Sequence, residues 1–487
     1  MSGFTNEERF LNNLARKSFL RFWSWPNLFR DQRNRGCKGD GKELCDLVVV
    51  FGNDVLLFSD KKIKFNTAKP LNIAWARWAR EAIGESVKQI FGAKRWLVNY
   101  QDRIFLNKEC SERLPLELPK EDQVTFHFIV VCHGCEEVAV EHHGAPSFSF
   151  CREIVADEHW DSNKCEPFVI GRGFNEEFVH VFNEATIELV LREFDTINDF
   201  INYLNERKRL LLREDIFHVG CESDIIQLHY ENLDEVNKNY CASRFSSPHS
   251  SVAIDKGGLG KLFNNPVYVA KKNADAVSYF WDDLIEAFSF HVLNGTSEGR
   301  NWEKPHEIEP GLRAMASTNR FQRRLLSQAF MEFYEKTEPG QRGTRIVLDV
   351  LDDSRAFLFF LLPHVPHMGT NQDYRILRRS ILTEYCAINK YLRQSLNSIL
   401  MIAAKTRTPG RKLSKYFFDE GQDFVLMDCS DWGEEDYASA KDVYEEFISN
   451  RLISPQKMFT ENVRDFPKIE GSDALGSDQV NHLIYHN

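Results

Sequence analysis

Two runs of apolar residues near the N-terminus predict a β-hairpin. The runs Cys45–Phe51 (CDLVVVF) and Val55–Phe58 (VLLF) are rich in β-branched and other apolar side chains, and Gly52-Asn53 lies between them. A short connection that contains Gly and Asn is typical of a tight turn between two strands. A third apolar run, Val124–Cys132 (VTFHFIVVC), predicts a further buried strand.

Helical patterns alternate with these strands. The first helix is expected to begin at Thr5, where Glu8 completes a capping box. The segment Ile73–Leu97 predicts a long amphipathic helix, because one of its faces collects the side chains that should pack on the sheet. The residues of that face are Trp75, Trp78, Ala82, Ser86 and Gln89. Residues 1–135 are therefore expected to run helix, strand, strand, helix, strand.

The remainder of the chain predicts two further regions. Residues 136–245 are expected to form a middle α/β region, with strands at Phe178–Phe182, Ile187–Leu191 and Asp224–Tyr230 and a helix at Ile197–Leu211. The polar stretch Ser243–Gly260 is the expected linker. Residues 261–487 are expected to form an α+β domain that recognises a target or a partner. Its predicted elements are helices at Val277–Leu293, Leu312–Glu335 and Tyr374–Ala403 and a strand pair at Arg345–Leu351 and Arg355–Leu362.

Composition agrees with a folded protein. Of the 487 residues, 43% are hydrophobic and 27% are charged, which excludes a disordered chain. No apolar run approaches the ~18 residues of a membrane span, and the charged start MSGFTNEERF does not resemble a signal peptide. The eleven cysteines are scattered and odd in number, so we expect free thiols in a cytoplasmic protein. Because no run is long enough to span a membrane, no membrane partner is expected.

The net charge of −11 conceals two basic segments. Residues 1–112 carry 20 Lys and Arg against 13 Asp and Glu, and Arg375–Lys412 carries nine basic residues against one acid. Such segments can meet the phosphates of nucleic acid. The side chains predicted to do so are Arg375, Arg378, Arg379, Arg407, Arg411 and Lys412. The alternative is that they pair within the chain with the acidic segment 419–446.

The predicted hairpin carries two carboxylates and a lysine at one end. Counting outward from the turn places Asp46 opposite Ser59, so that Asp60 lies one residue further along. Asp60 and Lys62 point to the same side of their strand. Two carboxylates can hold Mg²⁺ or Mn²⁺, which activates a water molecule, and an ammonium group can orient that water and offset developing negative charge. The alternative is that these are ordinary charged residues at a strand end.

This arrangement, with Asp46 and then Asp60-x-Lys62 on adjacent strands between helices, resembles the PD-(D/E)XK or restriction-endonuclease-like nuclease superfamily. Cys45 stands where many members have Pro, and Asp60 stands where Glu is more usual. The resemblance implies an α/β fold in which a mixed sheet is flanked by helices over residues 1–135. It also implies supporting roles for Gln89 on the following helix and for an acid of the first helix, Glu8 or Glu7, although Glu8 is equally explained by the capping box.

The expected function is therefore metal-dependent hydrolysis of nucleic acid, DNA rather than RNA. An antiviral effector in a prokaryote is the expected setting, and a second copy of the chain or another protein is a possible partner. The alternative is a catalytically silent nuclease fold that acts by binding partners. A weaker alternative is an RNA-cleaving toxin on the same fold.

A zinc site is less expected than a magnesium site. Cys132-His133-Gly134-Cys135, with Cys151 and Cys165 further along, could supply four thiolates. Only one C-x-x-C pair is present, however, and Cys132 ends an apolar strand, where buried free cysteine is common.

Overall fold

In the computed structural model the chain divides into two compact units, Met1–Val269 (unit 1) and Ala270–Asn487 (unit 2), and each is described separately. The residues that the structure describes are 6–31, 41–174, 177–234, 239–247, 251–255, 257, 260–296, 304–365, 368–408, 417–418, 421–453, 457–463 and 478–485. The expected cap at Thr5 lies outside them. None of the described helices is both long enough and apolar enough to cross a bilayer.

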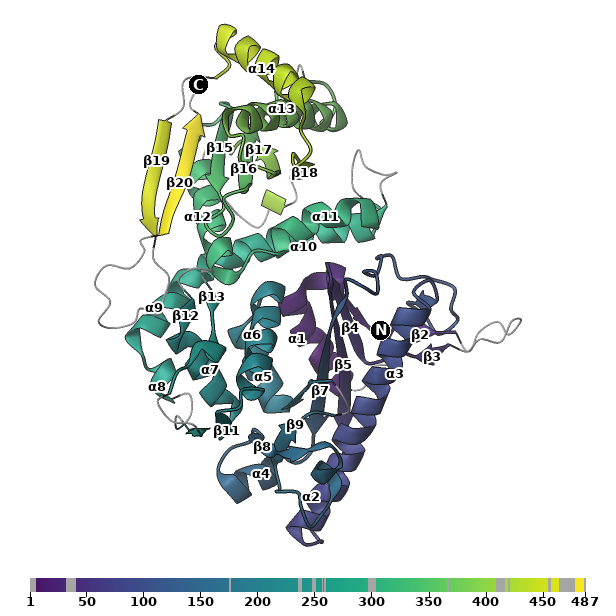
Figure 1. The fold of residues 1–487 in the computed structure, drawn as a ribbon. Helices are drawn as coiled ribbons and strands as arrows, with labels where there is room; N and C mark the ends of the chain where they lie inside the picture. The colour runs from purple at the N-terminus through teal and green to yellow at the C-terminus, as the bar shows by residue number, and fades with distance from the viewer. Residues whose placement is uncertain are drawn as a thin grey trace. The chain divides into compact units, whose positions relative to one another are not determined.

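Unit 1 is built on a five-stranded mixed sheet in the order β1-β4-β5-β7-β10 (Figure 1). Neighbours β1, β4 and β5 are antiparallel, whereas β5, β7 and β10 run parallel to one another. The strands are β1 (Ser24–Pro26), β4 (Leu47–Phe51), β5 (Asp54–Lys62), β7 (Thr125–His133) and β10 (Val179–Asn183). Because β10 joins this sheet, the N-terminal sheet extends beyond residue 135, and the predicted middle region belongs to the same compact unit.

The predicted hairpin is confirmed. Phe51 pairs with Asp54 and Leu47 pairs with Phe58, which is the register counted from the turn. Gly52 has a φ of 58°, a left-handed conformation that glycine adopts without a steric penalty. The edge strand β1 was not predicted. Its three residues directly follow a helical pattern, and so short a segment shows no alternation of apolar and polar residues.

Helices cover both faces of the sheet (Figure 1). On one face lie α1 (Asn6–Trp23), α5 (Glu184–Glu193) and α6 (Ile197–Leu211), where the ring of Phe19 contacts Phe58 and Phe200. On the other face a helix runs through α2 (Leu71–Ala79), a π-helical turn η1 (Arg80–Gly84) and α3 (Glu85–Asn99), and Phe91 contacts Phe128. The predicted apolar face of this helix is buried at Trp75, Trp78, Ala82 and Ser86 and half-buried at Gln89. The rings of Trp75 and Trp78 contact Phe148, which lies outside this sheet.

Two predicted strands of the middle region are helices instead. Ile187–Leu191 lies in α5, whose first turn is capped by the Asn183 side chain, and Asp224–Tyr230 lies in α7 (Glu222–Glu231). The hydrophobic period of a short apolar run does not show whether the run forms a strand or a helix. In these two segments the capping residues at the helix ends favour a helix. The predicted helix Ile197–Leu211 is confirmed with Thr196 as its cap.

The other elements of unit 1 form smaller layers. A four-stranded sheet has the order β14-β11-β8-β9, and two further small sheets pair β2 with β3 and β6, and β12 with β13. The remaining elements are β2 (Phe29–Arg30), β3 (Lys42–Glu43), β6 (Ile104–Phe105), α4 (Glu136–His143), β8 (Ser149–Val155), η2 (Ala156–Trp160), β9 (Val169–Arg172), β11 (Ile216–Val219), β12 (Leu233–Asp234), β13 (Asn239–Tyr240), η3 (Ala242–Arg244), β14 (Val252–Ile254) and α8 (Gly260–Phe263). The helix α9 (Pro266–Asp275) begins in unit 1 and ends in unit 2.

Unit 2 holds a six-stranded sheet in the order β18-β17-β16-β15-β20-β19. The predicted strand pair is present as β15 and β16, which are antiparallel, and β16 and β17 are parallel strands joined by α13. The elements are η4 (Ala276–Ser278), α10 (Tyr279–Leu293), α11 (Pro305–Ala316), α12 (Arg320–Lys336), β15 (Gly343–Leu348), β16 (Arg355–Leu362), α13 (Asn371–Leu392), β17 (Ser398–Lys405), β18 (Asp423–Asp428), α14 (Glu434–Ser449), β19 (Lys457–Val463) and β20 (Asp478–Tyr485).

Two predicted helices of unit 2 are shorter than expected. The helix predicted at Leu312–Glu335 is divided between α11 and α12, because Asn319 caps a new helix through its side chain. The helix predicted at Tyr374–Ala403 ends at Leu392, and Ser398–Lys405 forms β17, an interior strand between β18 and β16. The apolar stretch Ile399–Ala404 is buried on both faces, which explains why its period did not reveal a strand.

The buried His229 makes unit 1 sensitive to acid. It lies among aromatic rings that include Phe194 and Tyr203, and burial lowers its pKa to about 3. Between pH 6.5 and about 3 the unfolded chain therefore binds a proton that the folded chain does not, so stability falls as the pH falls. The protonation of one such histidine lowers the free energy of unfolding by about 1.4 kcal/mol per pH unit at most. We therefore expect His229→Phe to lose less melting temperature than the wild type between pH 7 and pH 5. The exposed His291→Phe is the control, and equal losses in all three proteins would contradict the prediction.

Candidate active site

The candidate site lies where the three parallel strands of unit 1 end. Asp60 and Lys62 are at the end of β5, His133 is the last residue of β7, and Glu184 follows β10 as the first residue of α5. The register pairs Lys62 with His133 and Asp60 with Val131, so the side chains of Asp60 and His133 lie on the same face of the sheet. The carboxyl ends of parallel strands are where open α/β sheets commonly bind ligands.

The structure brings Asp46 and Asp60 together, as the hairpin register requires. Asp46 directly precedes β4, and its Oδ2 accepts a hydrogen bond of 2.6 Å from the backbone N–H of Asp60. The Asp46 carboxylate is therefore fixed beside the residue that the sequence paired with it.

His133 lies between two carboxylates. Its Nε2 is 2.5 Å from Oδ1 of Asp60, and its Nδ1 is 2.9 Å from Oε2 of Glu184. Burial alone would lower the pKa of His133, but the hydrogen bonds and negative charges of Asp60 and Glu184 outweigh burial and raise the pKa to about 9. Without a bound metal, the ring is therefore an imidazolium at neutral pH, and both ring nitrogens donate.

Two buried carboxylate oxygens near this histidine have no hydrogen-bond donor among the described residues. One is Oδ2 of Asp60, whose side chain is 1% exposed, and the other is Oε1 of Glu136 in the first turn of α4. A buried anionic oxygen without a donor or a cation is costly. The arrangement is therefore suited to binding a cation.

The chain after β7 is held close to β5. Gly134 has a φ of +101°, and a Cβ at this position would lie 2.4 Å from the carbonyl oxygen of Ile63, so only glycine fits. The indole N–H of Trp78 donates to that same carbonyl at 2.8 Å. The N–H of Gly134 in turn donates to Oε2 of Glu136 at 2.7 Å, which orients the Glu136 carboxylate.

The other predicted site residues are placed differently. Lys62 lies two residues beyond Asp60 on the same face of β5, and its side chain is exposed. The Gln89 side chain accepts a hydrogen bond of 3.0 Å from Ser59, on the face of the sheet opposite to the Asp60 carboxylate. Gln89 therefore contacts β5 on the face that does not carry the Asp60 carboxylate. Glu8 falls within α1, but its side chain lies outside the described residues.

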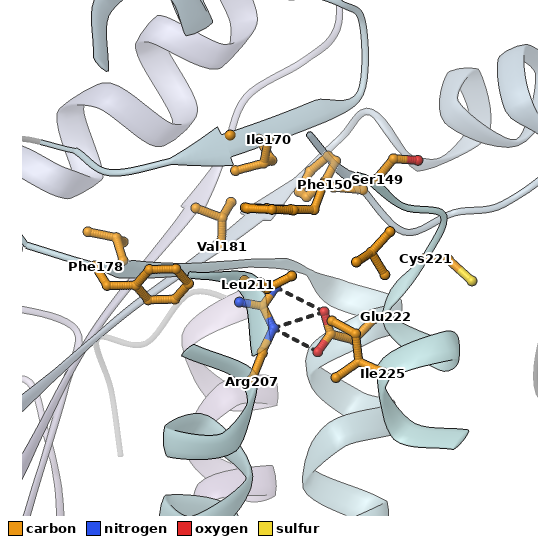
Figure 2. A pocket seen from close by; sticks show the side chains of 14 residues that line it. Ser149, Phe150, Ile170, Phe178, Val181, Arg207, Leu211, Cys221, Glu222 and Ile225 are labelled. Carbon is orange, nitrogen blue, oxygen red and sulfur yellow. Dashed lines mark hydrogen bonds and ion pairs between the residues drawn. The ribbon is translucent and has the colours of Figure 1, made fainter. Parts of the chain in front are cut away.

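Unit 1 has a second buried polar cluster beside a small cavity (Figure 2). Arg207 on α6 forms an ion pair of 2.8 Å with Glu222 on α7, and the hydroxyl of Tyr203 also donates to Glu222. Burial, together with the charge of Arg207, lowers the pKa of His180, which lies against this guanidinium. These charges neutralise one another, so the cluster is structural.

The arginines predicted to contact phosphates instead pair within unit 2. Arg375, Arg378 and Arg379 all bind the carboxylate of Asp423, which belongs to the acidic segment named as the alternative. The side chain of Arg378 is 0% exposed, and the other two are less than one-fifth exposed. The pairing within the chain, which was the alternative to phosphate contact, is therefore present in this structure, and the phosphate-contact role stays a prediction.

Arg407 is also bound within the chain, and the thiols of the C-x-x-C pair are buried. The guanidinium of Arg407 donates to the carbonyl oxygen of Thr337 at 3.1 Å and lies 3.8 Å from Glu338, whereas Arg411 and Lys412 lie outside the described residues. Cys132 and Cys135 are buried free cysteines, and burial raises the pKa of both thiols, so neither is poised to act as a thiolate.

Sequence reasoning missed His133, Glu136 and Glu184. Their common signal is their position: each stands at or just after the end of a strand that runs parallel to β5. His133 was considered only with the neighbouring cysteines, and Glu184 was hidden because the residues after it were taken for a strand. These residues come together because β5 pairs in parallel with β7, about seventy residues further along the chain. Pairing over such a distance cannot be predicted from a local sequence pattern.

Removing the Asp423 carboxylate should destabilise unit 2. Asp423→Ala leaves three guanidinium groups without their shared partner, one of them fully buried, and we expect a loss of about 3–5 kcal/mol in the free energy of unfolding. Urea unfolding followed by circular dichroism measures it. The control is Asp428→Ala on the same strand, where the carboxylate is exposed and bonds to Ser430. Unchanged stability with strengthened nucleic-acid binding would instead support the phosphate-contact role, because the variant frees the three guanidinium groups.

Comparison of the chain with models of known protein families, with curated proteins and with solved structures gives no match.

Proposed function

We propose that unit 1 hydrolyses phosphodiester bonds of nucleic acid with a bound divalent metal ion. The observation that carries the proposal is the hydrogen bond from the backbone N–H of Asp60 to the Asp46 carboxylate at the carboxyl end of β5, next to Oδ2 of Asp60, which is buried and lacks a donor among the described residues. A mixed sheet with helices on both faces supports the proposal at the level of an α/β fold. The PD-(D/E)XK-like core is part of the proposal.

The proposed chemistry uses three side chains of the hairpin. Asp46 and Asp60 would hold Mg²⁺ or Mn²⁺ through carboxylate oxygens, the ligands that these cations prefer. The metal ion, when bound, polarises the phosphate and lowers the pKa of a water molecule. Lys62, exposed on the same face as Asp60, would orient that water and offset the charge that develops as the bond between phosphorus and the leaving oxygen breaks.

The substrate class is proposed from the distribution of charge along the chain. The excess of basic residues in the first 112 positions favours a polyanion, and DNA is the proposed polymer, with RNA as the alternative. A role in defence against foreign nucleic acid rests on the family resemblance alone.

Neutralising Asp60 should abolish cleavage. Plasmid, linear duplex, single-stranded DNA and RNA are each incubated with Mg²⁺, Mn²⁺ or EDTA. We expect metal-dependent cleavage by the wild-type protein and a loss of at least ~100-fold in Asp60→Asn, because an interaction worth several kcal/mol in the transition state is removed.

A matched control exists on the same strand. Asp54 at the other end of β5 also bonds to a histidine of β7, since its Oδ1 is 2.7 Å from Nε2 of His127. Asp54→Asn should cleave at the wild-type rate. Wild-type cleavage by Asp60→Asn would contradict the proposal, and no cleavage by the wild-type protein under any condition would favour the binding-protein alternative.

Replacing Lys62 should affect cleavage without affecting the fold. Because the side chain is exposed, Lys62→Ala should leave the melting temperature within a few degrees of wild type, whereas the cleavage rate should fall by roughly 100-fold. The neighbouring Lys61→Ala, whose side chain points to the other face of β5, is the control. Equal rates in the two variants would remove Lys62 from the proposed mechanism.

A further inference from the structure

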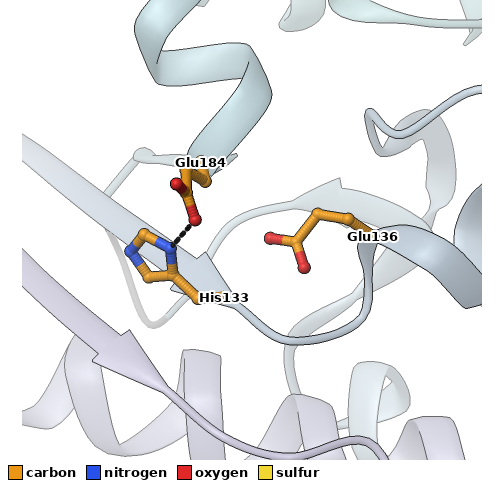
Figure 3. A group of neighbouring side chains, drawn as sticks. All are labelled: His133, Glu136 and Glu184. Atoms are coloured by element: carbon orange, nitrogen blue, oxygen red, sulfur yellow. Dashed lines mark hydrogen bonds and ion pairs between the residues drawn. The ribbon is translucent and has the colours of Figure 1, made fainter. Parts of the chain in front are cut away.

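Three side chains beside Asp60 can reach a single cation. The ligand atoms of His133, Glu136 and Glu184 lie within 4.8 Å of one another at the ends of β7 and β10 (Figure 3). Two ligands at about 2.1 Å from one metal ion are at most about 4.2 Å apart, so a modest side-chain rotation brings all three atoms onto one ion. The set joins one imidazole to two carboxylates from two different helices.

We propose that His133, Glu136 and Glu184 form a site for a first-row transition-metal cation such as Mn²⁺ or Zn²⁺, with Asp60 holding the imidazole in place from the other side. The site is distinct from the one assigned to Asp46 and Asp60. It does not rest on the proposed nuclease function, because metal binding can be measured without any substrate.

The position of Asp60 is the first argument. A histidine that binds a metal through one ring nitrogen generally donates from the other nitrogen to a carboxylate, which fixes the tautomer and the ring orientation. Here Nε2 of His133 donates to Asp60 at 2.5 Å, and Nδ1 faces Glu184 at 2.9 Å. A cation that enters between His133 and Glu184 would therefore bind Nδ1 and release its proton to solvent.

The orientation of Glu136 is the second argument. Its Oε2 is fixed by the N–H of Gly134, and its Oε1 is buried with no donor among the described residues. The side chain of Asp60 is also buried and keeps a second oxygen without a donor. Three carboxylates around one imidazole leave an excess of negative charge, and a bound cation would compensate it.

The donor set indicates the class of metal. Imidazole suits Zn²⁺ and Fe²⁺, and carboxylates suit Mn²⁺, so a mixed donor set fits a first-row transition metal; Mg²⁺ prefers oxygen ligands and retains its water molecules. Three protein ligands leave positions open for water or substrate, as in catalytic metal sites. The Glu184 side chain is 51% exposed, so a cation can enter from solvent, while His133 beneath it is only 2% exposed.

The test measures binding of Mn²⁺ to the full chain after metal removal, by electron paramagnetic resonance and calorimetry. Glu136→Gln and Glu184→Gln keep the side-chain volume and should each weaken binding at this site by at least about tenfold. His127→Gln, a change of the other β7 histidine that bonds to an aspartate, should bind as the wild type does. Asp46→Asn should also retain this site, which separates it from the one proposed at Asp46 and Asp60.

Other outcomes decide against the site. Wild-type affinity in both glutamine variants would overturn the proposal, as would a wild-type protein that binds neither Mn²⁺, Co²⁺ nor Zn²⁺ at about 1 mM free cation. His133→Gln should lose the visible absorption spectrum of bound Co²⁺. Because His133 is buried and this variant could fail to fold, the two glutamate variants, whose side chains are less buried, keep the test decisive.

Discussion

Parallel hydrogen bonding between β5 and β7 extends from Asp54 and Thr125 at one end to Lys62 and His133 at the other. Its register is held by burial, because a slip of one residue would turn every side chain of the strand to the opposite face. In this register His133 stands on the same face as Asp60, and the turn at Gly134 presses against the end of β5. The contact between Asp60 and His133, which joins the two proposed cation sites, depends on this alignment.

Local patterns predicted the parts of the site that are close in sequence. The hairpin turn at Gly52-Asn53 determines the pairing of β4 with β5, so the approach of Asp46 to Asp60 followed from counting residues. The amphipathic period of residues 73–97 likewise predicted which side chains are buried. These inferences succeed because short connections leave a single register to choose.

Long-range pairing produced what the sequence could not predict. Asp60 and His133 are joined across a helix and a long loop, and Arg378 is joined to Asp423 by the packing of α13 against β18. A count of charges treats Arg378 as a solvated cation, although the side chain is fully buried in an ion pair. Buried charges are therefore identified by their partners and not by their number.

The same excess of carboxylates would link cation and substrate. A phosphate that approaches Asp60, Glu136 and Glu184 meets like charge, whereas a bound cation reverses the sign of the local field. If a phosphate binds at this edge, the cation increases its affinity, and the phosphate must increase the affinity of the cation by the same factor. Loading of the metal would then act as a gate on nucleic-acid binding, set by the concentration of free cation around the protein.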